Sequence, residues 1–220
     1  TWEHPLGTDS VGRDNLSRVI YGARLTLIAG LVSISVAISV GAPLGAIAGY
    51  AGGRIDTLIM RSIDVILSFP SLLVALLVVV ALEPGWPAVM LAVGTINIPV
   101  FCRQIRATTL GLRDADFVVA ARAAGATPVY ILSRAILPSL VNPLIVLATL
   151  GLGTAILEVA GLSFLGIAGE ISVPEWGNML TTAKNNLRTS LWPALAPGLA
   201  IYLAVLGFNL LGDGLRDTLD

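Results

Sequence analysis

Few side chains in this sequence have the types and the spacing that catalysis, metal binding or nucleotide binding requires. Cys102 is the only cysteine and His4 the only histidine, which excludes an internal disulfide and a His/Cys metal site. The only lysine, Lys184, has no glycine before it, so the chain lacks the G-x4-G-K-[ST] loop that holds the phosphates of ATP. A serine protease of the membrane would need a Ser/His pair, but His4 is distant from every apolar run. We therefore expect no catalytic residue, no bound cofactor and no metal ligand in this chain, which is not expected to be an enzyme.

Two carboxylates lie within or at the edge of long apolar stretches, where a charge is costly. A charge at the centre of a bilayer costs about 2.5 to 3.5 kcal/mol on insertion scales, so each is a functional candidate. Asp64 has Arg61 three positions earlier, which favours a local ion pair over a proton relay. Glu158 has no basic residue within four positions. Its carboxylate could face a water-filled path, receive the charge of a partner or reach the interface, and these alternatives stay open.

Three asparagines also lie in apolar stretches, namely Asn97, Asn142 and Asn209. Their amides could line a path for a solute or form hydrogen bonds between helices, and the second role is the better expectation. Two of these asparagines and the two carboxylates are our candidates for lining a translocation path: Glu158, Asn97, Asn142 and Asp64.

The composition requires a membrane as the solvent for most of the chain. Hydrophobic residues make up 55% of the sequence and charged residues only 12%, against roughly a quarter in soluble proteins. The net charge of −1 gives no basic excess for nucleic acid. The apolar runs are continuous rather than alternating, which favours helices over barrel strands. We predict an all-α polytopic bundle with five spanning helices at about 25–50, 57–82, 86–109, 139–161 and 191–212.

The long connections between these helices predict the orientation in the membrane. Residues 103–138 carry five arginines, and the positive-inside rule makes that connection cytoplasmic. The connection 162–190 then lies outside, as do all four tryptophans: Trp2, Trp86, Trp176 and Trp192. We expect residues 1–24 to be an extracytoplasmic segment, 25–212 the transmembrane domain and 213–220 a cytoplasmic tail.

The first predicted helix carries a stripe of small residues. Gly41, Gly45 and Gly49 repeat every four positions, a spacing that lets two membrane helices approach closely. Packing within the chain is the favoured interpretation, and contact with a partner subunit is the alternative.

The connection at 114–138 is too apolar for a solvated loop and predicts two short helices. Asp114 could cap the first, and Gly125 could stop it with a positive φ. Thr127 followed by Pro128 predicts the start of the second, which should end before Pro138. The first helix presents a small-residue stripe with one aromatic, made of Phe117, Ala120, Ala121 and Ala124. A partner could pack closely there. The alternative, a helix on lipid headgroups, is weak because only Arg122 lies in its polar face.

The same loop resembles the EAA loop of bacterial ABC importer permeases. The resemblance rests on AA-x3-G at 120–125, followed after eleven residues by Leu137 and Pro138. Other blocks are similar to the second permease subunit of the dipeptide, oligopeptide and nickel transporters: HPLGTDSVGRDNLSRVIYGAR, GYAGGRIDTLIMRSIDVILSFPSLL, GLSFLGIAG with PEWGNML, and NLLGDGLRDTLD. The match runs nearly from end to end.

Three departures from the family pattern limit what the resemblance implies. Val119 stands where the motif has Glu, so the polar contact of that Glu is not expected here. Ala135 stands where the motif has Ile. The chain also starts after the point where a first membrane helix of the family would end.

The resemblance implies an importer permease in the bacterial inner membrane. Its implied partners are a companion permease subunit, two ATP-binding-cassette ATPases that hold ATP and Mg, an extracytoplasmic solute-binding protein and membrane lipid. The loop would couple to an ATPase through Asp116, Phe117, Ala120, Ala121, Ala124, Gly125, Leu137 and Pro138. The solute would be a peptide, nickel or a related small molecule. The alternative is a channel or secondary transporter driven by an ion gradient through Asp64 and Glu158, which would leave the apolar loop unexplained.

Overall fold

Four long helices frame the molecule in the computed structural model, which describes residues 4–9, 11–168, 172–184, 187 and 190–219. Each is long and apolar enough to cross a membrane. They are α1 (Asn15–Ala51), α4 (Trp86–Arg113), α8 (Val141–Phe164) and α10 (Trp192–Leu219). The described residues form helices and connections, with no strand beyond an isolated bridge between Thr8 and Asp14. The prediction of an all-α membrane bundle is therefore confirmed.

Two of the long helices extend further than their apolar runs predicted. α1 begins at Asn15 rather than near 25, because the Asp14 carboxylate accepts a hydrogen bond from the Ser17 N–H and caps the helix. α10 continues to Leu219, so most of the predicted tail at 213–220 is a further helical segment. The apolar runs marked the buried or lipid-facing lengths, whereas capping and continued backbone hydrogen bonding set the ends.

The predicted helix at 57–82 is wrong as a single straight helix. It consists of α2 (Gly53–Leu67) and α3 (Ser71–Ala81), which meet at a bend of 91°. Pro70 lacks an N–H and disfavours helical backbone at the residue before it, so Phe69 falls in the break. The pair is either one broken span or a re-entrant segment.

α1 packs most extensively against α4, along the predicted glycine stripe. A Cβ atom on Gly41 would lie 2.8 Å from the Ile98 carbonyl oxygen, and one on Gly49 would lie 2.8 Å from the Arg106 carbonyl oxygen. Gly45 faces the α4 backbone between them. The stripe thus serves packing within the chain, the favoured of the two alternatives.

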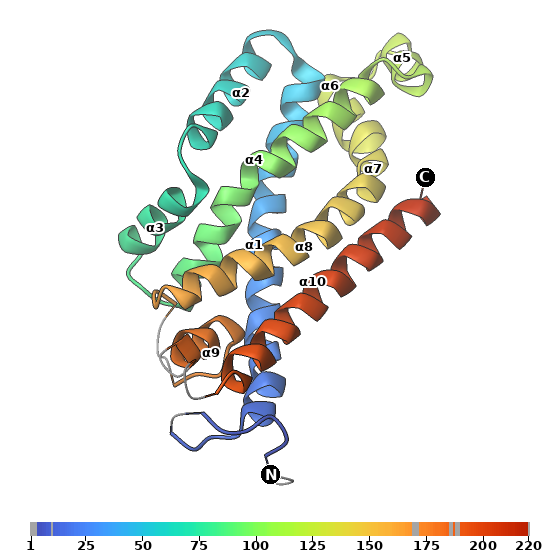
Figure 1. Ribbon diagram of the computed structural model, residues 1–220. Helices are drawn as coiled ribbons and strands as arrows, with labels where there is room; N and C mark the ends of the chain where they lie inside the picture. The colour runs from blue at the N-terminus through green and yellow to red at the C-terminus, as the bar shows by residue number, and fades with distance from the viewer. Residues whose placement is uncertain (1–3, 10, 169–171, 185–186, 188–189, 220) are drawn as a thin grey trace.

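Short helices lie at both ends of the bundle, and α3 lies along its side (Figure 1). One end, which we call the α5 end, holds the turn between α1 and α2 and the helices α5 (Asp116–Ala123), α6 (Pro128–Tyr130) and α7 (Leu137–Ser139). The opposite end, the α9 end, holds the N-terminal segment and α9 (Trp176–Ala183).

The path from α5 into α8 contains a wide helical turn. Gly125 has a φ of 82°, and the Thr127 hydroxyl accepts a hydrogen bond from the Tyr130 N–H, as the sequence predicted. The predicted end before Pro138 is wrong, because the π-helix η1 (Ile131–Ile136) leads into α7 without a break. A wider turn accommodates a proline, whose ring would clash with the carbonyl four residues earlier in a regular α-helix.

Candidate functional site

α5 presents its small residues to solvent only in part. Phe117 is 45% exposed and Ala120 and Ala124 are exposed, whereas Ala121 is half-buried against the chain's own apolar cluster. The predicted stripe of four therefore divides between an outer face and an inner contact. The predicted cap at Asp114 is also wrong, since the N-cap is Ala115 and the helix begins at Asp116.

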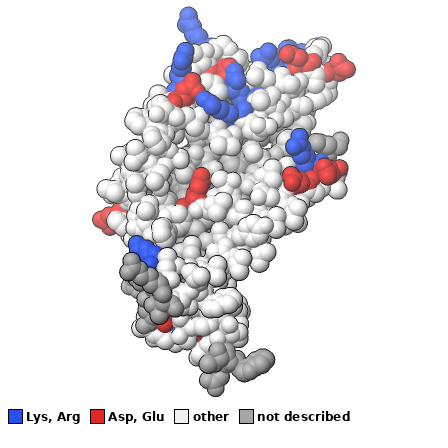
Figure 2. All heavy atoms as spheres, in the orientation of Figure 1, with Lys and Arg blue, Asp and Glu red and all other residues white. Residues whose placement is uncertain are grey.

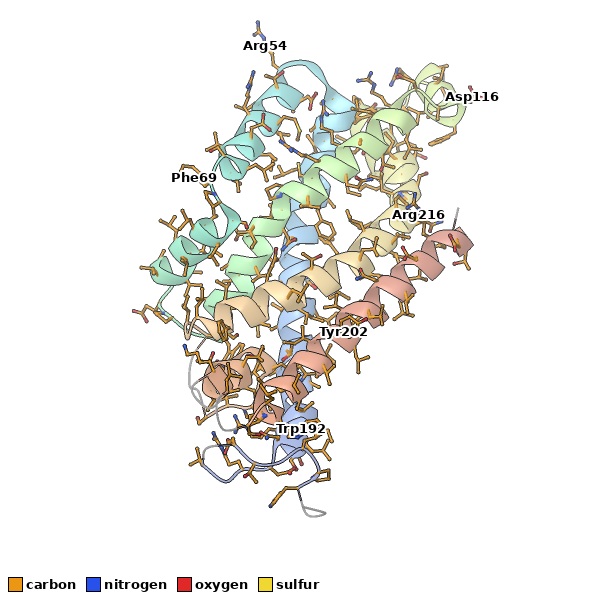
Figure 3. The ribbon with its side chains drawn as sticks, viewed as in Figure 1. Arg54, Phe69, Asp116, Trp192, Tyr202 and Arg216 are labelled. Carbon is orange, nitrogen blue, oxygen red and sulfur yellow. The ribbon has the colours of Figure 1, made fainter. Side chains whose placement is uncertain are left out.

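The inner side of α5 is anchored by Val118, a residue that the sequence analysis did not single out. Val118 is fully buried in a cluster with Ile105 of α4 and Ile131 and Ile136 of η1. This anchoring fixes the outer face at the α5 end, where Figure 3 places Asp116 well away from Trp192 at the other end. A rigid surface at one end of the bundle can transmit a displacement to the helices that hold it.

Leu137 and Pro138 lie apart from the outer face of α5. They line an apolar hollow of about 480 Å³, together with Ala42 of α1, Ile105 of α4 and Leu144 of α8. Both side chains are exposed in the single chain, so the hollow is open on the surface. The loop therefore offers two separate features rather than one continuous stripe.

Glu158 lies in the apolar middle of the molecule and is held by an asparagine. The Asn97 Nδ2 atom donates a hydrogen bond of 2.6 Å to the Glu158 Oε2 atom and one of 2.9 Å to the Val93 carbonyl oxygen. Asn97 is buried and Glu158 is half-buried. Among the described residues no lysine, arginine or histidine forms an ion pair with Glu158. Figure 2 shows most charges at the α5 end and a second group at the right edge, whereas an acidic group stands alone in the largely uncharged middle.

The predicted partner of Asp64 is wrong. Its carboxylate pairs with Arg103 of α4 at 2.6 Å, not with Arg61 one turn earlier. Both side chains of this pair are about half exposed. A second pair joins the same two helices, because the Nε and Nη2 atoms of Arg106 both donate to the Asp56 carboxylate. Together the pairs tie α2 to α4.

Asn142 belongs to a third location. It lines a hollow of about 610 Å³ at the α5 end, between α4, α8 and α10, with Gln104, Ser139 and Arg216. The four path candidates therefore do not converge: Glu158 and Asn97 meet, whereas Asp64 and Asn142 lie elsewhere.

A buried carboxylate at the α9 end escaped the sequence analysis. Glu175 is fully buried, caps α9 by accepting a 2.8 Å hydrogen bond from the Asn178 N–H, and also accepts one of 3.3 Å from the Thr26 hydroxyl. Burial raises the pKa of this carboxyl, although the hydrogen bonds that it accepts act in the opposite direction. The Trp176 Nε1 atom donates to the Val19 carbonyl oxygen at 2.9 Å, which further binds α9 to α1. An acid directly before an apolar short helix was the available signal.

Comparison with known proteins places the chain among transport permeases. Residues 41–220 match the family described as the inner membrane component of binding-protein-dependent transport systems. The dipeptide transport system permease of Alkalihalophilus pseudofirmus is 46% identical over 99% of this chain and 72% of its own length. A dipeptide permease of Haemophilus influenzae is 44% identical over 98% of this chain and 73% of its own. A glutathione transport system permease of Escherichia coli is 45% identical over 99% of this chain and 72% of its own.

The fold itself is shared with a distant solved structure. A chain of the methionine ABC transporter MetNI in an inward-facing conformation superposes with a TM-score of 0.76 at 18% identity, covering 92% of this chain and 96% of that one. At that identity the likeness concerns the arrangement of helices.

Proposed function

Because the chain belongs to the family of inner membrane components of binding-protein-dependent transport systems, we propose that it carries peptides inward as one of the two permease subunits of a peptide importer. The observation that carries this proposal is the identity of 44 to 46% to permeases named for dipeptide transport, extending over at least 98% of the chain. Several apolar helices make it a multi-pass membrane protein. Relatives named for glutathione extend the solute class to tripeptides.

The partners follow from what this chain lacks and what its family requires. It has no phosphate-binding loop, so ATP and Mg bind to two separate ATPase subunits. A companion permease completes the path as a heterodimer, and an extracytoplasmic binding protein delivers the peptide. The N-terminus lies outside and the C-terminus in the cytoplasm, in agreement with the arginines of the α5 end.

Coupling to an ATPase takes place at the outer face of α5. Phe117, Ala120 and Ala124 are exposed there, and small side chains allow a partner groove to approach the helix closely. Val118 and Ala121 connect that face to α4 and η1, so movement of the groove reaches the membrane helices as a rigid-body displacement.

The proposal is tested by reconstituting the chain in proteoliposomes with its companion permease, ATPases and binding protein. We expect uptake of a labelled dipeptide that requires ATP and stops when the binding protein is omitted. Uptake that proceeds without ATPase subunits and follows a proton or sodium gradient would instead establish the secondary transporter. Uptake of nickel in place of any peptide would reassign the solute.

A further inference from the structure

The Glu158 carboxylate lies among apolar residues, where a negative charge needs a positively charged partner. The described residues supply no such partner. α3 and α8 contain no lysine, arginine or histidine, and in the middle of α4 the nearest polar partner is the Asn97 amide. The nearest arginine of α4 along the chain, Arg103, is already paired with Asp64. The amide of Asn97 orients the carboxylate but carries no charge to balance it.

The carboxylate also faces a small cavity rather than a packed interior. Glu158 lines a space of about 120 Å³ between α3, α4 and α8, with Ser71, Leu72, Ala75 and Ile96. Ser71 and Leu72 at its edge are exposed, so the cavity opens on the surface of the single chain. A charged residue at this depth faces a bundle interior or a water-filled space, because contact with hydrocarbon costs several kcal/mol. The opening therefore points away from lipid.

We propose that Glu158, held by Asn97, is a binding site for the protonated amino group of the transported peptide. The proposal rests on the proposed function and adds the chemistry by which the path holds its solute. A free amino terminus is common to dipeptides of every side chain, so one carboxylate serves solutes of varied sequence. The mostly apolar wall of Leu72, Ala75, Ile96 and Leu162 accepts the first side chain without selecting a polar one.

The competing occupant is a cation of the companion permease, and the two occupants differ in what Glu158→Gln would do. This substitution keeps the size of the side chain and an oxygen for the Asn97 hydrogen bond, but removes the charge. If Glu158 holds the solute, the complex assembles normally, while uptake of labelled dipeptide in proteoliposomes falls at least tenfold. Glu83→Gln is the matched control, because the same chemical change occurs at an exposed turn, and it keeps wild-type uptake.

Binding is measured directly on the purified complex without the binding protein, by saturation-transfer NMR of a dipeptide and of its N-acetylated form. We expect the wild-type complex to saturate the dipeptide at least tenfold more strongly than the N-acetylated form, and the Glu158→Gln complex to lose that difference. Equal saturation of the two solutes by the wild type, or equal behaviour of the two complexes, overturns the site. Failure of Glu158→Gln to copurify with the companion permease would instead identify a subunit cation as its partner.

These results separate the site from the proposed function. ATP-dependent dipeptide uptake by the wild type supports peptide import whatever Glu158→Gln does. Normal uptake by Glu158→Gln then removes the amino-group site alone.

Discussion

At the scale of single residues, the close contact between α1 and α4 depends on glycines, which have no side chain to hold the two backbones apart. Gly41, Gly45 and Gly49 let the backbone of α1 touch that of α4, where even one methyl group would meet backbone atoms. Membrane helices gain little from hydrophobic association with each other, so close van der Waals packing of this kind supplies much of their attraction.

Gly45→Ala should destabilise the chain by about 1 to 3 kcal/mol, because its Cβ would lie 3.0 Å from the Arg106 nitrogen and closer still to the Cys102 carbonyl oxygen. Thermal unfolding in detergent, followed by a thiol-independent fluorescent probe, measures the change. Gly111→Ala on α4 is the control: nothing lies within 4 Å of its Cβ position, so alanine should leave the melting temperature unchanged or raise it. A raised melting temperature for Gly45→Ala would contradict the close contact.

The glycine stripe could be predicted from the sequence, whereas the ion pairs between α2 and α4 could not. Small residues repeated at i+4 along one helix announce a packing face, and that prediction agrees with the α1–α4 contact. The partners of Asp64 and Asp56 lie 39 and 50 positions away on α4, beyond any local pattern. Proximity in sequence favoured Arg61 for Asp64, and tertiary packing chose Arg103 instead.

Asp56→Asn should cost more stability than Asp64→Asn. Asp56 accepts two hydrogen bonds from a partly buried Arg106, and such charged contacts contribute about 1.5 kcal/mol or more each in favourable cases. Asp64 and Arg103 are about half exposed, where an ion pair contributes roughly 0.2 to 1 kcal/mol. Melting temperatures of the two variants in the same detergent rank them. The reverse order would mean that the Asp64–Arg103 pair, despite its exposure, stabilises the contact between α2 and α4 more than the Asp56–Arg106 pair does.

At the scale of elements, α5 is a short helix whose two sides have different roles. Its inner side carries Val118 and half-buried Ala121 into the chain's own cluster, while Ala120 and Ala124 stay exposed. The helical pattern in the sequence placed all four stripe residues on one face, but only the packing of η1 and α4 determines which part of that face remains free.

Ala120→Glu should abolish coupling without unfolding the chain, because it places an unpaired charge in a close contact that exists only in the full complex. We expect wild-type stability of the isolated chain, together with loss of ATP-driven uptake and of solute-stimulated ATP hydrolysis. Ala51→Glu, an equal change at an exposed position at the end of α1, is the control and should retain uptake.

Ala121→Glu distinguishes the two sides of the helix. Because Ala121 is half-buried against the cluster, this variant should lower the melting temperature as well as uptake. Normal uptake by Ala120→Glu at wild-type expression would show that the outer face of α5 does not contact an ATPase, and the coupling role would have to move elsewhere.

The bends between elements were the least predictable part of the fold. Pro70 breaks a helix by 91°, whereas Pro138 is accommodated within a continuous helical path by the π-turn of η1. Both prolines look alike in sequence, since each removes one N–H and restricts its predecessor. The outcome depends on whether packing against other helices stabilises a widened turn. In η1 it does, because Ile131 and Ile136 are buried.

At the scale of the whole molecule, arginine and tryptophan residues are unevenly distributed along the bundle axis. Figure 3 places Arg54 and Asp116 toward the α5 end and Trp192 toward the α9 end. Five further arginines belong to segments that lead to or lie in the α5 end: Arg103, Arg106, Arg113, Arg122 and Arg134. This asymmetry extends the sequence pattern into three dimensions and favours a cytoplasmic α5 end.

The orientation is tested by the accessibility of single cysteines in a Cys102→Ser background. Ser133 on η1 and Ser190 before α10 are both exposed and lie at opposite ends, so each can report one side of the membrane. We expect an impermeant thiol reagent added to intact cells to label Ser190→Cys at once, and Ser133→Cys only after the membrane is opened, because arginine-rich segments are retained in the cytoplasm. ATP-dependent uptake by both variants verifies that the labelled protein is the folded importer. Labelling of Ser133→Cys from outside, with Ser190→Cys protected, would invert the molecule in the membrane, and the outer face of α5 could then no longer meet a cytoplasmic ATPase.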